Sequence, residues 1–150
     1  MVNRTWSAIK PGLLPLLLAT YPALFHYANN VVITLLSSLL RMLLLNSLLA
    51  ISIYIVFLIF YKRQAARAAV AAFVFLIFFN CYGILYDFLL KLDIIQLEHY
   101  SFLPLFILLS IYVSWLTAKI NDSSLARFCT TTALILGILV TFNIIRIIPH

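Results

Sequence analysis

Five long apolar runs separated by short polar stretches dominate the pattern of the chain. They cover about residues 13–27, 39–60, 66–88, 102–117 and 125–148. A hydrocarbon core of about 30 Å needs roughly 20 helical residues, and fewer where interfacial side chains flank the helix. The pattern therefore predicts an all-α fold, a bundle of five transmembrane helices that forms one domain over residues 1–150.

Two of the connecting stretches are themselves partly apolar. Residues 28–38 contain the pair Asn29-Asn30 and then the run Val31–Leu36, which would lie poorly in water. A re-entrant or interface-lying segment is expected there, because other helices then cover its backbone. Residues 89–100 mix charged side chains with leucine and isoleucine, which predicts a short amphipathic stretch on the membrane surface.

The first and third runs carry features that predict how they pack. Pro15 and Pro22 interrupt the first run, so a kink or a shallow, tilted span is expected. Ala65, Ala69 and Ala72 lie on one face at the start of the third run. Small residues let a neighbouring helix approach closely, so this end of the run is expected to be a tight packing point. The alternative is that alanine merely favours the helix.

Composition agrees with a membrane protein. Hydrophobic residues make up 65% of the chain and charged residues 9%, with a mean hydropathy of +1.15. Soluble domains carry roughly 25% charged residues, and a domain of this size has no core large enough to hide such an apolar fraction. Cys81 and Cys129 both fall inside predicted spans. Neither a disulfide framework nor a thiolate metal site is expected from them.

The basic stretch Tyr61–Arg67 sets the expected orientation. It places Lys62, Arg63 and Arg67 in a tight turn between two apolar runs. Such clusters stay on the cytoplasmic side of a membrane. The other loops agree with one arrangement, in which the N-terminus lies inside and the C-terminus outside. The inside then also carries Arg4, Lys10, Lys119 and Arg127, and the outside carries Arg41, Lys91 and Arg146.

The net charge of +6 does not indicate nucleic-acid binding, because the basic residues are scattered and mostly flank apolar runs. At the N-terminus, Arg4 and Lys10 before Leu13–Leu18 imitate a signal peptide. No small-x-small cleavage site follows, so an uncleaved first helix is expected.

Polar side chains gather at the ends of the runs that face away from the basic stretch. We expect these ends to converge into a mildly cationic pocket at the outer leaflet, suited to a lipid head group or to a docking partner. The alternative is that each side chain snorkels or bonds to one neighbouring helix, and that nothing binds. The candidate residues are His26, Asn30, Arg41, Asn80, Asp87, His99 and Arg146.

Patterns typical of catalysis are absent from the sequence. It contains no Gly-rich phosphate loop, nucleophile elbow or paired catalytic carboxylates. His26 and His99 lack a cysteine or carboxylate at ligand spacing, and a proton relay through His26, Tyr86 and Asp87 would lie at the membrane edge. No catalysis, metal or cofactor is expected. A bound lipid, or a pigment on His26, stays an alternative.

The same ends of the runs carry a family resemblance. Tyr21–Asn30, which reads YPALFHYANN, resembles the first-helix signature of the membrane module that precedes sulfatase-like domains of the alkaline phosphatase superfamily in bacterial envelope proteins. Further short motifs follow in the same order, and the resemblance covers about residues 13–148. These motifs are Leu39-Leu40-Arg41, Phe79 with Tyr82-Gly83 and Tyr86, and His99-Tyr100 with Leu103-Pro104.

The resemblance implies a membrane anchor and lipid-facing platform in the bacterial cytoplasmic (inner) membrane. In that family an extracytoplasmic domain with a metal-bound nucleophile follows the helices, and residues 1–150 do not include it. Ile84 also stands where the family often has histidine. The resemblance therefore lends no catalysis to these residues.

The expected function is that of a non-catalytic, multi-pass membrane module, or a small subunit that docks a larger photosynthetic or respiratory assembly. Its expected partners are membrane lipid and other membrane protein subunits, and not nucleic acid. One alternative is the anchor of a sulfatase-like hydrolase or transferase. Another is a small transporter or channel, which needs a polar track that the inner halves of the runs barely supply.

Overall fold

The computed structural model describes residues 2–31, 35–91 and 99–148, and every regular element in these ranges is helical. The α-helices confirm the expected all-α bundle. They are α1 (Val2–Asn29), α2 (Leu36–Phe60), α3 (Ala65–Lys91), α4 (His99–Leu116) and α5 (Asp122–Ile147), with a short 3₁₀ helix, η1 (Thr117–Lys119), between the last two.

Three helical segments are long and apolar enough to cross a membrane: Leu36–Phe60, Ala65–Leu89 and Asp122–Ile147. A fourth apolar segment, Leu103–Leu116, is shorter. Long apolar helices satisfy their backbone groups internally, as hydrocarbon requires. These segments support the helical membrane-protein character predicted from the sequence.

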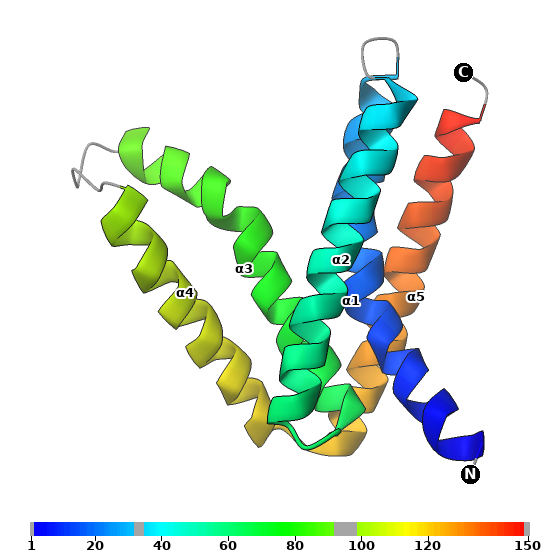
Figure 1. The fold of residues 1–150 in the computed structure, drawn as a ribbon, viewed down its shortest axis with the longest axis vertical. Helices are drawn as coiled ribbons and strands as arrows, with labels where there is room; N and C mark the ends of the chain where they lie inside the picture. Colours follow the sequence, from blue (N-terminus) through cyan, green and yellow to red (C-terminus); the bar gives the residue numbers. More distant parts are fainter. Residues whose placement is uncertain (1, 32–34, 92–98, 149–150) are drawn as a thin grey trace.

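The helices form a bundle from which one hairpin diverges (Figure 1). Helix α1 packs against α2, α3 and α5, whereas α4, among the described elements, packs only against α3 and η1. The turn Tyr61–Gln64 marks what we call the basic-turn end of the molecule. Helix α1 begins at this end, and α5 finishes at the opposite end (Figure 1). The far parts of α3 and α4 lean away from α2 (Figure 1).

The core is densest near the basic-turn end, where α3 begins. Ala68, Ala69, Ala71 and Ala72 have no exposed surface. One buried cluster joins α1, α3 and α5 through Leu14, Ala69, Phe73, Leu125 and Cys129. The Cys129 thiol donates to the Ala66 carbonyl at 3.7 Å, which shows how closely α5 approaches α3. The predicted tight packing point is confirmed, because small side chains here leave room for neighbouring helices.

Buried hydrogen bonds fix α4 to the rest of the bundle at the same end. The Tyr61 hydroxyl donates to the Ser114 carbonyl at 3.1 Å, and the Ser114 hydroxyl donates to the Ala71 carbonyl at 3.2 Å. Burial raises the pKa of Tyr61, although its contacts with Thr117 and Arg67 lower it. The phenol therefore keeps its proton at neutral pH and remains a donor. Arg67 Nε also bonds Asp122 Oδ1 at 2.8 Å, which ties α3 to the start of α5.

The first helix extends well beyond the predicted span of 13–27, because it begins at Val2 and runs through Pro11, Pro15 and Pro22. Each proline removes one backbone donor, but a helix packed against neighbours can continue past it.

The two predicted interfacial segments are shorter than expected where they are described. The predicted connector over 28–38 is helical at both of its ends. Residues 28 and 29 belong to α1, and α2 already begins at Leu36. Residues 32–34 lie outside the described ranges. The segment 89–100 is likewise shortened, since α3 continues to Lys91 and α4 begins at His99. The amphipathic stretch predicted between them, at 92–98, also lies outside.

Candidate functional site

The structure brings together one part of the predicted polar set, at the ends of α1, α2 and α5. A buried cluster of Ala23, Leu24, Tyr27 and Leu39 joins these ends. Arg146 Nη2 donates to Asn29 Oδ1 at 3.2 Å across the α1–α5 contact. His26, Arg41 and Arg146 are exposed, and Asn30 is half-buried. This end of the molecule therefore presents exposed basic side chains.

The other predicted residues belong to the diverging hairpin. Asn80 and Asp87 lie on α3, and His99 is the first residue of α4. Asp87 is exposed, and its part of α3 leans away from α2 and α5 (Figure 1). Among the described residues the ion pair is Arg67–Asp122, so the structure does not bring Asp87 to Arg41 or Arg146. The predicted residues thus lie in two separate groups.

Several polar side chains in or beside the helices bond to the preceding turn of the chain. Such bonds satisfy a hydroxyl or amide in hydrocarbon without a ligand or a neighbouring helix. The alternative in which nothing binds expected these side chains to snorkel or to bond to a neighbouring helix, whereas these bonds stay within one helix. The pairs are Thr20–Leu17, Asn29–Phe25, Asn30–His26, Asn80–Leu76, Ser110–Phe106, Thr130–Ala126, Thr141–Gly137 and Asn143–Leu139.

Asn143 on α5 is the buried member of this group. It is 2% exposed, and its amide nitrogen donates to the Leu139 carbonyl at 2.9 Å. Its Oδ1 finds no donor among the described residues. A buried, unbonded amide oxygen is costly in an apolar setting. This oxygen could accept one further hydrogen bond.

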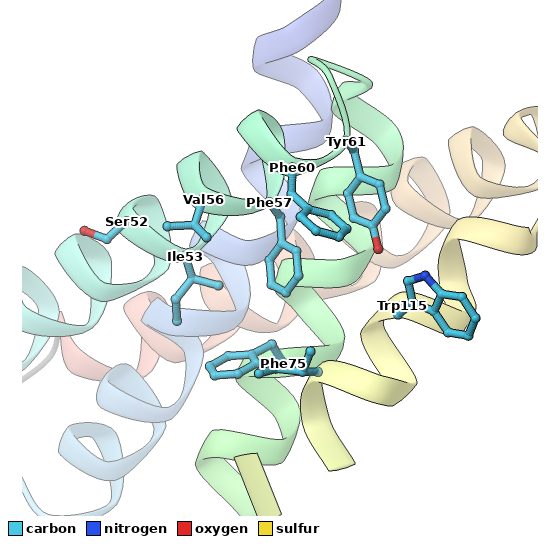
Figure 2. Close-up of a pocket in the computed structure, with 9 residues that line it drawn as sticks. Ser52, Ile53, Val56, Phe57, Phe60, Tyr61, Phe75 and Trp115 are labelled. Carbon is cyan, nitrogen blue, oxygen red and sulfur yellow. The ribbon is translucent and has the colours of Figure 1, made fainter. Parts of the chain in front are cut away.

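A concave apolar groove lies between α2, α3 and α4, and we call it the α2–α3–α4 groove (Figure 2). Its volume is about 450 Å³. It lies on the side of α3 where α2 and α4 separate. The lining residues are Ser52, Ile53, Val56, Phe57, Phe60, Tyr61, Phe75, Ile111 and Trp115.

Aromatic rings build the walls of this groove. Phe57 meets Phe75 edge-on at 6.3 Å between ring centroids, and it stacks against Tyr61 at 6.2 Å. The Lys119 ammonium lies 4.4 Å from the centroid of the Trp115 ring, a cation–π contact. Figure 2 shows Phe57 and Phe60 of α2, Phe75 of α3 and Trp115 of α4 arranged around the groove. Side chains from three helices, α2, α3 and α4, therefore line the groove.

Ser52 stands apart from the other lining residues. It is exposed, and Figure 2 shows its hydroxyl turned away from the aromatic side chains that line the groove. In transmembrane helices, serine is typical of surfaces where another helix packs closely or donates a hydrogen bond.

The groove was not predicted from the sequence. The signal that was present is the spacing of Ile53, Phe57 and Tyr61 on one face of the chain, which shares its aromatic character with Phe75 and Trp115. Such spacing is hard to see where almost every position is apolar.

The described residues contain no cluster of three or more His, Cys, Asp or Glu that could hold a metal ion. Comparisons with protein-family models, with curated proteins and with solved structures give no match.

Proposed function

We propose that the chain is a non-catalytic membrane module that docks a transmembrane helix of a larger assembly in the α2–α3–α4 groove. One observation carries this proposal: α4 packs against α3 and η1 alone among the described elements, and a groove of about 450 Å³ lies between α4 and α2. A helix seated there would contact α2 and α4 together. The partner would be the second α-helix in contact with α4, after α3.

A protein helix suits this groove better than a lipid chain does. Packing and interhelical hydrogen bonds drive association within a bilayer, where lipid tails are as apolar as leucine. Aromatic side chains from three helices supply the packing surface, and a helix with bulky side chains can interdigitate with them. From Ser52 to Phe60 the wall on α2 is about 12 Å long, at about 1.5 Å per helical residue. Two turns of a partner helix match that length.

The proposal includes five membrane crossings in a bacterial inner membrane, with the basic turn in the cytoplasm. Support comes from the alternating direction of the helices, with the start of α1 beside the basic turn and the end of α5 at the opposite end (Figure 1). An odd number of crossings places the two ends on different sides. Because Lys62 and Arg63 favour the cytoplasm, the end of α5 would then face outward.

A photo-crosslinking residue tests the docking directly. We expect Val56, which lines the groove and is 63% exposed, to give one discrete protein adduct in native membranes when it is replaced by such a residue. Ile51 is the matched control, because it is 45% exposed on the same helix. It lies about 140° away around the helix axis, so it faces lipid beside the groove. Mass spectrometry of the Val56 adduct should identify a peptide from the transmembrane helix of another protein.

The docking proposal fails if Val56 crosslinks only to lipid, or if Ile51 gives the same adduct in the same yield. An adduct made only of two copies of this 17.1 kDa chain would also contradict it, since the groove would then serve self-association.

A second candidate is the anchor of an extracytoplasmic sulfatase-like domain, as the resemblance implies. It is favoured by the position of the end of α5, which lies away from the basic turn (Figure 1). Exposed Arg41 and Arg146 near that end would suit an anionic lipid head group. The intact mass of the native polypeptide separates the two functions. A mass near 17.1 kDa supports the docking subunit, and a mass several times larger supports the anchored enzyme.

A further inference from the structure

The turn between α2 and α3 has an unusual backbone. Lys62 and Arg63 have φ angles of 49° and 66°, so two consecutive residues with side chains adopt the left-handed conformation. Glycine is the usual residue where a helix ends in this conformation, and other residues are disfavoured there. The turn is held by backbone bonds from Lys62 N to the Ile59 carbonyl at 3.1 Å and from Arg63 N to the Leu58 carbonyl at 2.7 Å. Two basic residues adopt this disfavoured conformation where glycine is usual, which points to a role for their side chains.

These two side chains stand above an apolar groove of their own, distinct from the α2–α3–α4 groove. We call it the basic-turn groove. Its lining is Ile55, Leu58, Ile59, Lys62 and Arg63, and its volume is about 720 Å³. The lining positions recur at intervals of three and four residues, which places them on one face of the end of α2. An apolar strip thus leads directly to two cations.

The charge of Lys62 and Arg63 is not balanced by a nearby acid among the described residues. Both side chains are exposed. Asp122, the acid described at this end, is bonded to Arg67 at 2.8 Å. Asp87 lies toward the far end of α3.

Two other cations of this end whose side chains the structure describes are engaged elsewhere. Lys119 lies over the Trp115 ring at 4.4 Å, and Arg127 Nε donates to the Ser123 carbonyl at 3.4 Å. Neither residue lines the basic-turn groove. Among the described side chains of this end, Lys62 and Arg63 are therefore the cations that lie beside this apolar strip.

We propose that the basic-turn groove is a binding site for an anionic phospholipid of the leaflet that faces the turn. Arg63 and Lys62 bind the phosphate through charge-assisted hydrogen bonds, and one acyl chain lies along Ile55, Leu58 and Ile59. The occupant is an anionic phospholipid because the site joins an apolar strip to uncompensated positive charge. A zwitterionic lipid would fill the strip but would leave that charge unneutralised. This inference rests on the proposed membrane location and is independent of the α2–α3–α4 groove.

Native mass spectrometry of the full chain, extracted from nanodiscs that contain equal amounts of phosphatidylglycerol and phosphatidylcholine with identical chains, tests the site. We expect retained phosphatidylglycerol to dominate for the unmodified protein. The double variant Lys62→Gln/Arg63→Gln should bind it about 30-fold more weakly, from roughly a fivefold loss for each basic side chain near the membrane surface. Lys62→Arg/Arg63→Lys should retain the preference, because both charges remain.

The matched control is Lys119→Gln/Arg127→Gln, which removes the same charge from the same end but away from the basic-turn groove. We expect its effect on phosphatidylglycerol binding to stay below about threefold, because only the general surface potential changes. Replacing Ile59 with asparagine should weaken binding although both cations remain, because the acyl chain loses its apolar contact. Inorganic phosphate at 10 mM should not displace the lipid, which separates a lipid site from a site for free phosphate.

The inference is overturned if Lys62→Gln/Arg63→Gln binds as the unmodified protein does, if the control pair lowers binding equally, or if inorganic phosphate competes. Incorporation into nanodiscs and helical content by circular dichroism are measured for every variant. Protein that inserts without lipid preference contradicts this site alone. Protein that fails to insert at all contradicts the proposed membrane function as well.

Discussion

Replacing Ala69 with leucine is expected to destabilise the bundle by about 3 kcal/mol, near the upper end of the cost of overpacking. Ala69 has no exposed surface and lies in the cluster that joins α1, α3 and α5. Its neighbours include Leu14 and Cys129, and the Cys129 sulfur already lies 3.7 Å from the backbone of α3. A leucine side chain has no free space there, so α5 or α1 must move away from α3. The free energy of unfolding, measured by adding SDS to the protein in mixed micelles, reports the loss.

Ala126→Leu is the control for this prediction. Ala126 lies on α5 and is exposed, so the same added volume faces lipid. We expect its effect to stay within about 0.5 kcal/mol. Equal effects from the two substitutions would show that the alanine face of α3 is not a packing point between helices.

Replacing Leu14 with alanine is expected to cost about 2 kcal/mol in the same titration. The Leu14 side chain has no exposed surface and fills the space between α1, α3 and α5. Its truncation leaves a cavity, and leucine-to-alanine changes in cores cost about 2–5 kcal/mol. The lower end of this range applies because Leu14 enters lipid, and not water, when α1 leaves the bundle. Most of the free-energy cost of exposing leucine to water is then absent.

Leu13→Ala provides the comparison, because the neighbouring leucine is 45% exposed. Its truncation should change the free energy of unfolding by less than about 0.5 kcal/mol. If Leu13 and Leu14 have the same effect, then α1 does not pack against α3 and α5 as the structure describes.

The number and approximate bounds of the α-helices were predictable from the sequence, because charged or polar stretches interrupt otherwise continuous apolar runs. The turn Tyr61–Gln64 separates α2 from α3 where the basic residues stand, and the polar stretch before Asp122 separates α4 from α5. The packing of Ala69 and Ala72 was predictable as well, since small residues at helical spacing mark one face.

The divergence of the α3–α4 hairpin was not predictable. Helix α4 has few polar positions, so its pattern gives little indication of which face meets another helix. The buried residues Phe106, Ser110 and Ser114 mark that face in the structure. The predicted polar pocket assumed that all helix ends converge, and Asp87 lies on the part that diverges. The start of α1 was also missed, because three prolines indicated breaks that packing overrides.

The central claim is that the chain is a membrane bundle with its basic turn in the cytoplasm and the end of α5 outside. Cysteine labelling in intact cells tests it most directly, in a background where Cys81 and Cys129 are replaced. Lys62→Cys and Ile148→Cys are both at exposed positions, and Ile148 is 75% exposed. With a membrane-impermeant maleimide, Ile148→Cys should react in intact cells, and Lys62→Cys should react only after permeabilisation. Labelling of Lys62→Cys in intact cells, or equal labelling of both positions there, would contradict the account.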